Sequence, residues 1–251
     1  MINCVILAGN EDSQLAEKSS KAFIELQGKP MIMYVIDALK ASNKVDKIAV
    51  VGDKSQLGSL SIHVNTIIDH KGSILDNIAA GARYFKEDDM LLISTCDIPL
   101  LTGEAVADFI TRALVSKADI CYPIINKTTC DLAYPESKRT YATLKEGQFT
   151  GGNLFMVNPT IIDRSLYIAE QMISYRKSPA KMSRVLGLPF LIKLATGRLS
   201  IEEVENRVSK LLNIRGKAII SKYAEIGNDV DRLEHVQVIE RYMQKNTRCI
   251  L

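Results

Sequence analysis

The chain has 251 residues, of which 47% are hydrophobic and 24% charged, a balance typical of a folded protein with a sizeable core. Its 32 basic and 29 acidic side chains leave a formal net charge of only +3, which predicts no extended basic surface for a polyanion. We therefore expect no nucleic acid partner. No run of about 18 apolar residues occurs, so we expect no membrane-spanning segment and no membrane partner.

The cysteines and the N-terminal region indicate the compartment. The five cysteines are scattered, with no CxxC pair and no histidine at metal-ligand spacing, which is typical of free thiols in a reducing environment. The first apolar run is interrupted after a few residues by Asn10, Glu11 and Asp12, so it does not match a secretory leader. These features predict a cytoplasmic protein.

Short apolar runs rich in β-branched residues alternate with amphipathic stretches over the first 122 residues. This alternation predicts βαβ units and an α/β fold with a mostly parallel central sheet flanked by helices. Ligands bind such sheets beyond the carboxyl ends of the strands, so we expect the functional residues in the loops that follow strands. The expected strands are 4–8, 48–51, 66–68, 90–94 and 119–122, and the expected helices are 30–42, 73–85 and 103–116.

After residue 123 the alternation stops. A polar stretch leads to an expected strand at 153–157, and the pattern is then helical to about residue 212, with a capping box formed by Ser200 and Glu203. A further strand and a closing helix follow. We therefore expect an α/β core made of residues 1–158 and 217–251, with a helical insertion or subdomain at 159–216 before the last strand. The apolar faces of its helices could pack on the core or on a second copy, which leaves a homodimer open.

The first apolar run ends in Leu7, Ala8 and Gly9, and a polar stretch follows that reaches Lys21. It contains a single glycine, and Ala22 follows the lysine, so it matches neither the dinucleotide-binding motif GxGxxG nor the P-loop motif GxxxxGK[ST]. Small side chains would still let a ligand approach the backbone, and the lysine could fold over a polyphosphate. An ordinary surface loop with a solvated lysine explains the same residues equally well.

Three aspartates follow or precede expected elements. Asp97 lies at the carboxyl end of the strand expected at 90–94, where a hard cation could bind, although it could instead cap the next turn. Asp229 and Asp231 precede an amphipathic helix, and taken alone they are explained as helix caps. Magnesium is typically held by one or two carboxylates and by oxygens of a substrate phosphate. Facing a phosphate-binding loop, these aspartates would therefore suit Mg²⁺.

Five motifs taken together resemble the MobA-like nucleotidyltransferases, also called NTP transferases. The family includes molybdenum-cofactor guanylyltransferases and enzymes that act on methylerythritol phosphate or sugar phosphates. The resemblance implies a Rossmann-like fold and Mg²⁺-dependent transfer of an NMP group from a nucleoside triphosphate to a small phosphorylated acceptor, with release of pyrophosphate. The motifs are LAG…K at 7–21, GKPMIMYVIDAL at 28–39, STCDIPLL at 94–101, TGGN at 150–153 and DVDRLE at 229–234.

The resemblance also implies roles for individual residues. Lys21 and Asp97 match the family's phosphate-contacting lysine and its magnesium aspartate, and both are the expected catalytic residues. Asp231 is the best match to the second metal position, with Asp229 as a close rival. The expected nucleotide-binding residues are Leu7, Ala8, Gly9, Asn10, Lys21, Gly72, Ser73 and Asp97. The expected acceptor-binding residues are Thr150, Gly151, Gly152 and Asn153.

The loop that follows the first strand departs from the family pattern. Asn10 stands where a second glycine is common, and no arginine lies between Gly9 and Lys21, although Lys18 could replace it as a point charge. A nucleotide-binding regulatory protein that lacks catalysis is therefore one alternative. A nucleotide-sugar glycosyltransferase is another, disfavoured because CDIP stands where that class would carry an acidic pair. The sequence specifies neither the base nor the acceptor.

Overall fold

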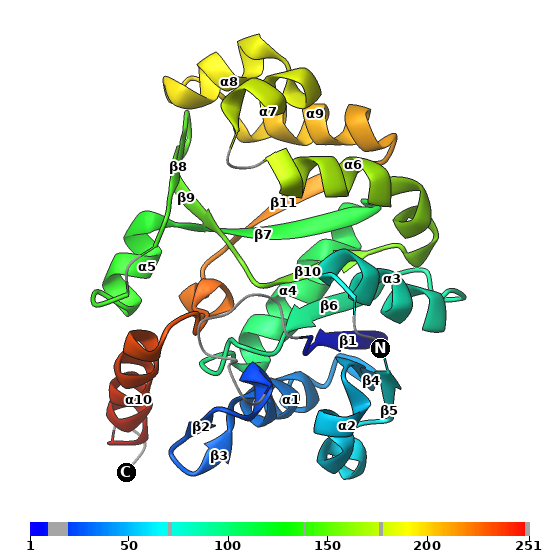
Figure 1. The fold of residues 1–251 in the computed structure, drawn as a ribbon. Coiled ribbons are helices and arrows are strands. Elements are labelled where there is room, and N and C mark those ends of the chain that lie inside the picture. The colour runs from blue at the N-terminus through cyan, green and yellow to red at the C-terminus, as the bar shows by residue number, and fades with distance from the viewer. Residues whose placement is uncertain (10–19, 70–71, 138, 176–177, 249–251) are drawn as a thin grey trace.

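The computed structural model describes residues 1–9, 20–69, 72–137, 139–175 and 178–248. Within them, nine strands form one sheet in the order β5-β4-β1-β6-β10-β7-β9-β8, with β11 paired to the other edge of β7 (Figure 1). The strands are β1 (Ile2–Leu7), β4 (Val45–Gly52), β5 (Thr66–Asp69), β6 (Leu91–Thr95), β7 (Ile120–Asn126), β8 (Ala142–Leu144), β9 (Gly147–Gly151), β10 (Leu154–Val157) and β11 (Gly216–Ser221).

The direction of the strands confirms the predicted fold class. β1 pairs in parallel with β4 and β6, β4 with β5, and β7 with β11. Strands β9 and β10 run against their neighbours. The sheet is therefore mixed but mostly parallel, and the fold is Rossmann-like α/β. The helices are α1 (Met31–Ala41), α2 (Lys54–Leu57), α3 (Ile74–Tyr84), α4 (Gly103–Ser116), α5 (Lys127–Ala133), α6 (Ile162–Tyr175), α7 (Pro179–Leu186), α8 (Leu188–Ala195), α9 (Ile201–Leu212) and α10 (Leu233–Arg248).

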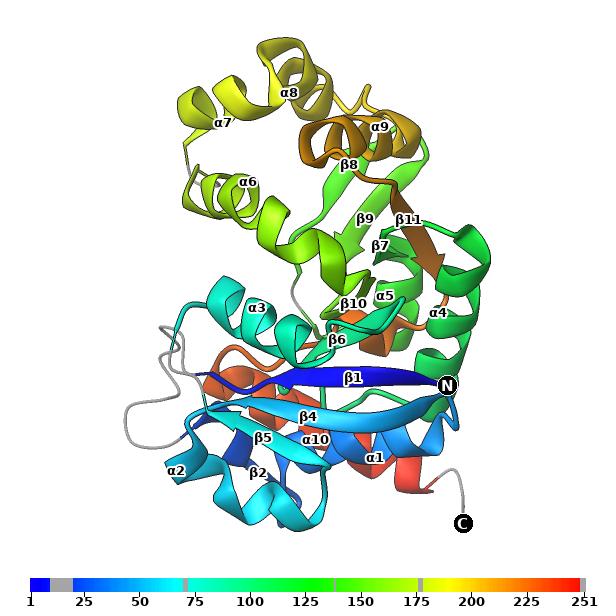
Figure 2. The same cartoon turned by 90° about the vertical axis from the view of Figure 1, so that its right-hand side faces the viewer.

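Strand β1 is buried on both faces because helices cover each of them. Cys4 and Ile6 pack in a cluster with residues of α1 and α4, whereas Val5 and Leu7 pack with residues of α3 and with Ile162 at the start of α6. Figure 2 shows α3 and α6 above β1 and β4, and α1 below them. Side chains of a strand alternate between its faces, so a run of apolar residues suits this central position.

The segment between β10 and β11 is helical, as predicted, and its four helices lie together at the top of Figure 1. The capping box of Ser200 and Glu203 is present at the start of α9. Leu166 of α6 packs in the cluster that contains α3, so this part of the segment shares the core. That residues 159–216 form a separate subdomain stays a prediction. None of the helices in the described ranges combines the length and the apolarity that crossing a bilayer requires.

The polar stretch after β7 contains elements that the sequence pattern did not predict. Helix α5 follows β7 directly, and β8 and β9 form a hairpin before β10. These elements are short, so neither shows a clear helical or strand period. A second short hairpin, β2 (Glu25–Leu26) with β3 (Lys29–Pro30), was also missed, and Leu26 packs against Ile239 and Tyr242 of α10.

Helix α3 approaches β1 closely through Gly81. A Cβ at Gly81 would lie 2.7 Å from Val5 Cγ1, too short for an ordinary contact. We predict that Gly81→Ala destabilises the protein by about 1–2 kcal/mol, because overpacking outweighs the gain in helix propensity. Gly58→Ala is the matched control: no atom lies within 4 Å of its Cβ, and we expect a change of about 0.5 kcal/mol or less. Equal unfolding free energies in urea for the two variants would contradict this packing.

Candidate active site

Asp97 is held at the carboxyl end of β6. The strand is buried to Ser94, and Thr95 Oγ1 then donates a hydrogen bond of 2.5 Å to Asp97 Oδ1. The carbonyl oxygen of Asp97 accepts the backbone N–H of Val230 at 2.9 Å. The segment before α10 is thereby fixed beside the end of β6, although the two are far apart in the sequence.

Lys21 reaches the same point from the loop that follows β1. Ser20 caps the short 3₁₀ helix Lys21–Phe23, and its hydroxyl donates to the carbonyl oxygen of Ala8 at 3.4 Å. Lys21 Nζ lies 2.5 Å from Asp97 Oδ2 and 2.9 Å from Asp231 Oδ1. The predicted catalytic residues Lys21 and Asp97 are therefore in direct contact.

Asp97, Asp229 and Asp231 form one acidic cluster, in which one oxygen from each carboxylate lies within 4.8 Å of the others. Burial raises the pKa of Asp229 to about 7, and a hydrogen bond with Asp231 and the charge of Asp97 act in the same direction. Burial also acts to raise the pKa of Asp231, but hydrogen bonds from Asp229 and Lys21 outweigh it and lower this pKa. The carboxyl of Asp229 thus holds a proton near neutrality, while the carboxyl of Asp231 is ionised.

The charge of Lys21 is fixed by the same carboxylates. Burial acts to lower the pKa of its ammonium group, but the charges and hydrogen bonds of Asp97 and Asp231 outweigh burial, so the pKa is raised. Lys21 therefore stays protonated at every pH at which the protein is expected to work.

Gly9 lies against the start of α3. A Cβ at Gly9 would stand 2.4 Å from Asn77 Nδ2, and this amide in turn donates to the carbonyl oxygen of Gly72 at 3.3 Å. The structure thus brings together Gly9, Gly72 and Ser73, which the sequence predicts to bind the nucleotide. Leu7 and Ala8 are buried, at 7% and 2% exposed. Asn10 and Lys18 lie outside the described residues.

A cleft of about 580 Å³ adjoins the acidic cluster at Asp229 and Asp231. Its lining includes all four predicted acceptor-binding residues, Thr150 to Asn153, together with Asp229 and Asp231. The turn at Gly152 and Asn153 is held by the backbone bonds Gly152 N–H to Pro123 O and Asn153 N–H to Ile226 O. A Cβ at Gly152 would lie 2.6 Å from Ile226 Cγ2, which explains the glycine.

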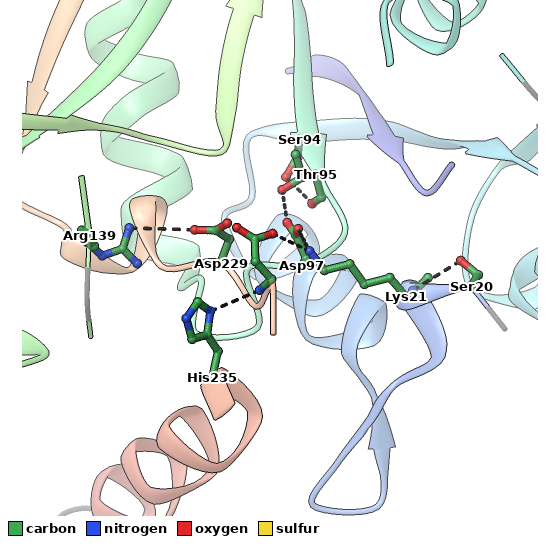
Figure 3. A network of polar contacts seen from close by, with 10 residues as sticks. Ser20, Lys21, Ser94, Thr95, Asp97, Arg139, Asp229 and His235 are labelled. Carbon is green, nitrogen blue, oxygen red and sulfur yellow. Dashed lines mark hydrogen bonds and ion pairs between the residues drawn. The ribbon is translucent and has the colours of Figure 1, made fainter. Parts of the chain in front are cut away.

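Arg139 is a site residue that the sequence analysis missed. It lies between α5 and β8, lines the cleft, and places its Nη1 3.9 Å from Asp229 Oδ1. Figure 3 shows Lys21 and Arg139 approaching Asp97 and Asp229 from opposite sides. His235 of α10 also lines the cleft, and its Nδ1 accepts the backbone N–H of Asp231 at 3.3 Å. No sequence signal singled out Arg139, because the surrounding stretch is polar and without a motif.

Comparison with known proteins identifies the family of this chain. The family described as "MobA-like NTP transferase domain" matches residues 4–186. A 2-C-methyl-D-erythritol 4-phosphate cytidylyltransferase from Clostridium perfringens is 28% identical over 114 residues, which are 44% of this chain and 49% of that protein. The chain thus matches about half the length of this curated relative.

Solved structures resemble the whole chain. A hypothetical transferase from Thermus thermophilus is 33% identical, with a TM-score of 0.83, covering 94% of this chain and 100% of that one. A CMP:2-keto-3-deoxy-manno-octonic acid synthetase complexed with CTP shares the fold at 14% identity, with a TM-score of 0.61, covering 98% and 99% of the two chains. The chain belongs to the MobA-like NTP transferase family, as the order of its motifs predicted.

The raised pKa of Asp229 predicts a pH-dependent stability. Because this carboxyl binds its proton more tightly in the folded state than in the unfolded chain, its contribution to stability is lost as the pH rises from about 4 to about 7. Asparagine mimics the protonated carboxyl and does not titrate. In metal-free protein we therefore expect Asp229→Asn to gain about 2 kcal/mol in unfolding free energy relative to the parent chain between pH 5 and pH 8.

The control is Asp163→Asn, which removes an exposed carboxylate paired with Arg83. Denaturant unfolding at the two pH values should show no such trend for this variant. An Asp229→Asn difference that is independent of pH would contradict the raised pKa.

Proposed function

We propose that this chain is a nucleotidyltransferase that moves an NMP group from a nucleoside triphosphate to a small phosphorylated acceptor and releases pyrophosphate. One observation carries this proposal. Lys21 and three aspartates meet at the carboxyl edge of the sheet, with Lys21 on one side of the carboxylates and a cleft lined by Thr150 to Asn153 on the other. Two substrates could thus approach one charged centre from two sides.

The acidic cluster suits a magnesium ion. Three carboxylates with oxygens within 4.8 Å of one another are hard donors of the kind that Mg²⁺ prefers. We propose that Asp97 and Asp231 hold the ion, with Asp229 as a further ligand once it has lost its proton. A bound Mg²⁺ would neutralise charge on the phosphate oxygens of the triphosphate.

The remaining roles belong to side chains and backbone. We propose that Lys21 stabilises negative charge on the transferring and leaving phosphates, since it stays protonated and is only 12% exposed. Gly9 lies against the start of α3 and has no side chain. The backbone near Gly72 and Ser73 would therefore be accessible to the base or sugar. An oxygen of the acceptor attacks the α-phosphorus, the bond to the pyrophosphate oxygen breaks, and the triphosphate and the acceptor need only be positioned in line.

The relatives support the class of reaction. The Clostridium perfringens relative is by its name a cytidylyltransferase whose acceptor carries a phosphate, and the synthetase of similar fold was solved with CTP. These names favour a triphosphate donor and a small acceptor. They leave the base open, because one or two hydrogen bonds can decide it.

We predict that one nucleoside triphosphate raises the melting temperature in the presence of Mg²⁺. A thermal-shift panel of GTP, CTP, UTP, ATP and dTTP, with and without the ion, would identify the base, because a ligand that binds only the folded state stabilises it. At a ligand concentration 100 times the Kd, the stabilisation is about 2.7 kcal/mol. If no triphosphate causes a magnesium-dependent shift, the proposal fails.

We predict that Asp97→Asn lowers turnover by at least about 100-fold while the fold is retained. Product analysis in the presence of the triphosphate and a panel of phosphorylated acceptors gives the measurement, and Asp163→Asn serves as the remote control. Pyrophosphate as the product supports nucleotidyl transfer. A nucleoside diphosphate would instead indicate glycosyl transfer, and binding without any product would indicate a regulatory protein.

A further inference from the structure

We propose that Arg139 and Asn228 form a subsite that binds an oxyanion of the acceptor, beside the acidic cluster. This inference rests on the proposed function, which it extends by assigning the charged group of the acceptor to two residues. Its ligand is a group with paired, negatively charged oxygens, either a phosphate or a carboxylate.

The first observation is that Arg139 is buried and incompletely paired. Its side chain is 8% exposed, and its Nη2 donates a 2.5 Å hydrogen bond to Asn228 Oδ1. Its Nη1 is 3.9 Å from Asp229 Oδ1, beyond hydrogen-bond distance, and its buried Nε has no hydrogen-bond partner. A buried guanidinium with an unpaired N–H is costly unless a ligand or water satisfies it.

The second observation is that the neighbouring Asn228 also has a buried donor without a hydrogen-bond partner in the described part of the chain. Asn228 is 2% exposed, and its Oδ1 accepts bonds from Arg139 and from the hydroxyl of Ser137 at 3.3 Å. This arrangement orients its Nδ2 as a donor, yet Nδ2 is buried and has no hydrogen-bond partner. Two unpaired N–H donors thus belong to residues that are bonded to each other and that line the same cleft.

The lining of the cleft carries the carboxylates of Asp229, Asp231 and Glu234 together with the guanidinium groups of Arg139 and Arg232. Glu136 also lines the cleft, but Arg241 pairs with it at 2.5 Å. A guanidinium presents a planar fork of donors, which matches the paired oxygens of phosphate or carboxylate.

The position of the subsite gives it a role in specificity. Arg139 lies across the carboxylates from Lys21 (Figure 3), so an oxyanion held by Arg139 would face a triphosphate held by Lys21. An uncharged alcohol would leave the donors of Arg139 and Asn228 unpaired, and a buried site rejects such a ligand strongly. The subsite therefore selects acceptors whose attacking group is itself anionic.

Calorimetry on the metal-free full chain, with inorganic phosphate and acetate as separate probes, tests the subsite. We expect Arg139→Lys to weaken binding of the preferred probe by about ten-fold or more, because lysine keeps the charge but loses the fork. Arg83→Lys, at an exposed ion pair remote from the cleft, should change the affinity by less than two-fold.

A second measurement uses the unaltered chain. The Nε–H resonance of Arg139 in a nitrogen-15 spectrum, assigned from its absence in Arg139→Lys, should shift when the probe binds. The preference between phosphate and acetate identifies the acceptor's anionic group.

Three results would overturn the inference: no binding of either probe to the parent chain, equal affinity in Arg139→Lys, or an Arg139 Nε–H resonance that does not shift when the probe binds. The proposed function fails separately, by the absence of any magnesium-dependent shift with a triphosphate, so the two failures are distinguishable.

Discussion

The ion pairs of Lys21 with Asp97 and Asp231 are the interaction on which the rest of the site depends. Three carboxylates with oxygens within 4.8 Å of one another repel, and a nearby cation or a bound proton relieves this repulsion in the partly buried cluster. Lys21 supplies the cation, and Asp229 takes up the proton through its raised pKa. The same contacts join the 3₁₀ helix that begins at Lys21, the end of β6 and the segment before α10.

The antiparallel strands β9 and β10 position the cleft next to the acidic cluster. Because β10 pairs with both β6 and β7, the turn at Gly152 and Asn153 sits beside the end of β6. The backbone N–H of Thr95 donates a 2.9 Å hydrogen bond to the carbonyl oxygen of Asn153. Because Thr95 is only two residues before Asp97, this bond fixes the turn close to the acidic cluster. The cleft and the acidic cluster are thus built on one rigid part of the sheet. Such support is what positioning two substrates in line requires.

The site has a cation on each side of its carboxylates, and the two differ in chemistry. Lys21 carries a compact charge that suits the non-bridging oxygens of a polyphosphate, and it comes from the loop end that adjoins Gly9. Arg139 carries a planar fork, is tied to Asn228, and faces the cleft. Under the proposed function, this asymmetry would distinguish the side that binds the triphosphate from the side that binds the acceptor.

The sequence by itself determined the strand and helix order of the α/β core, because the apolar periods are local and long. It also placed Asp97 and Gly9 at the carboxyl ends of strands, where parallel sheets bind ligands. It left open whether Asp229 and Asp231 were helix caps or site residues, and it missed Arg139, α5 and the β8–β9 hairpin. Only the tertiary structure decided that Lys21, Asp97 and Asp231 touch and that Arg139 faces them, since contacts between residues so distant in the chain depend on packing and leave no local pattern.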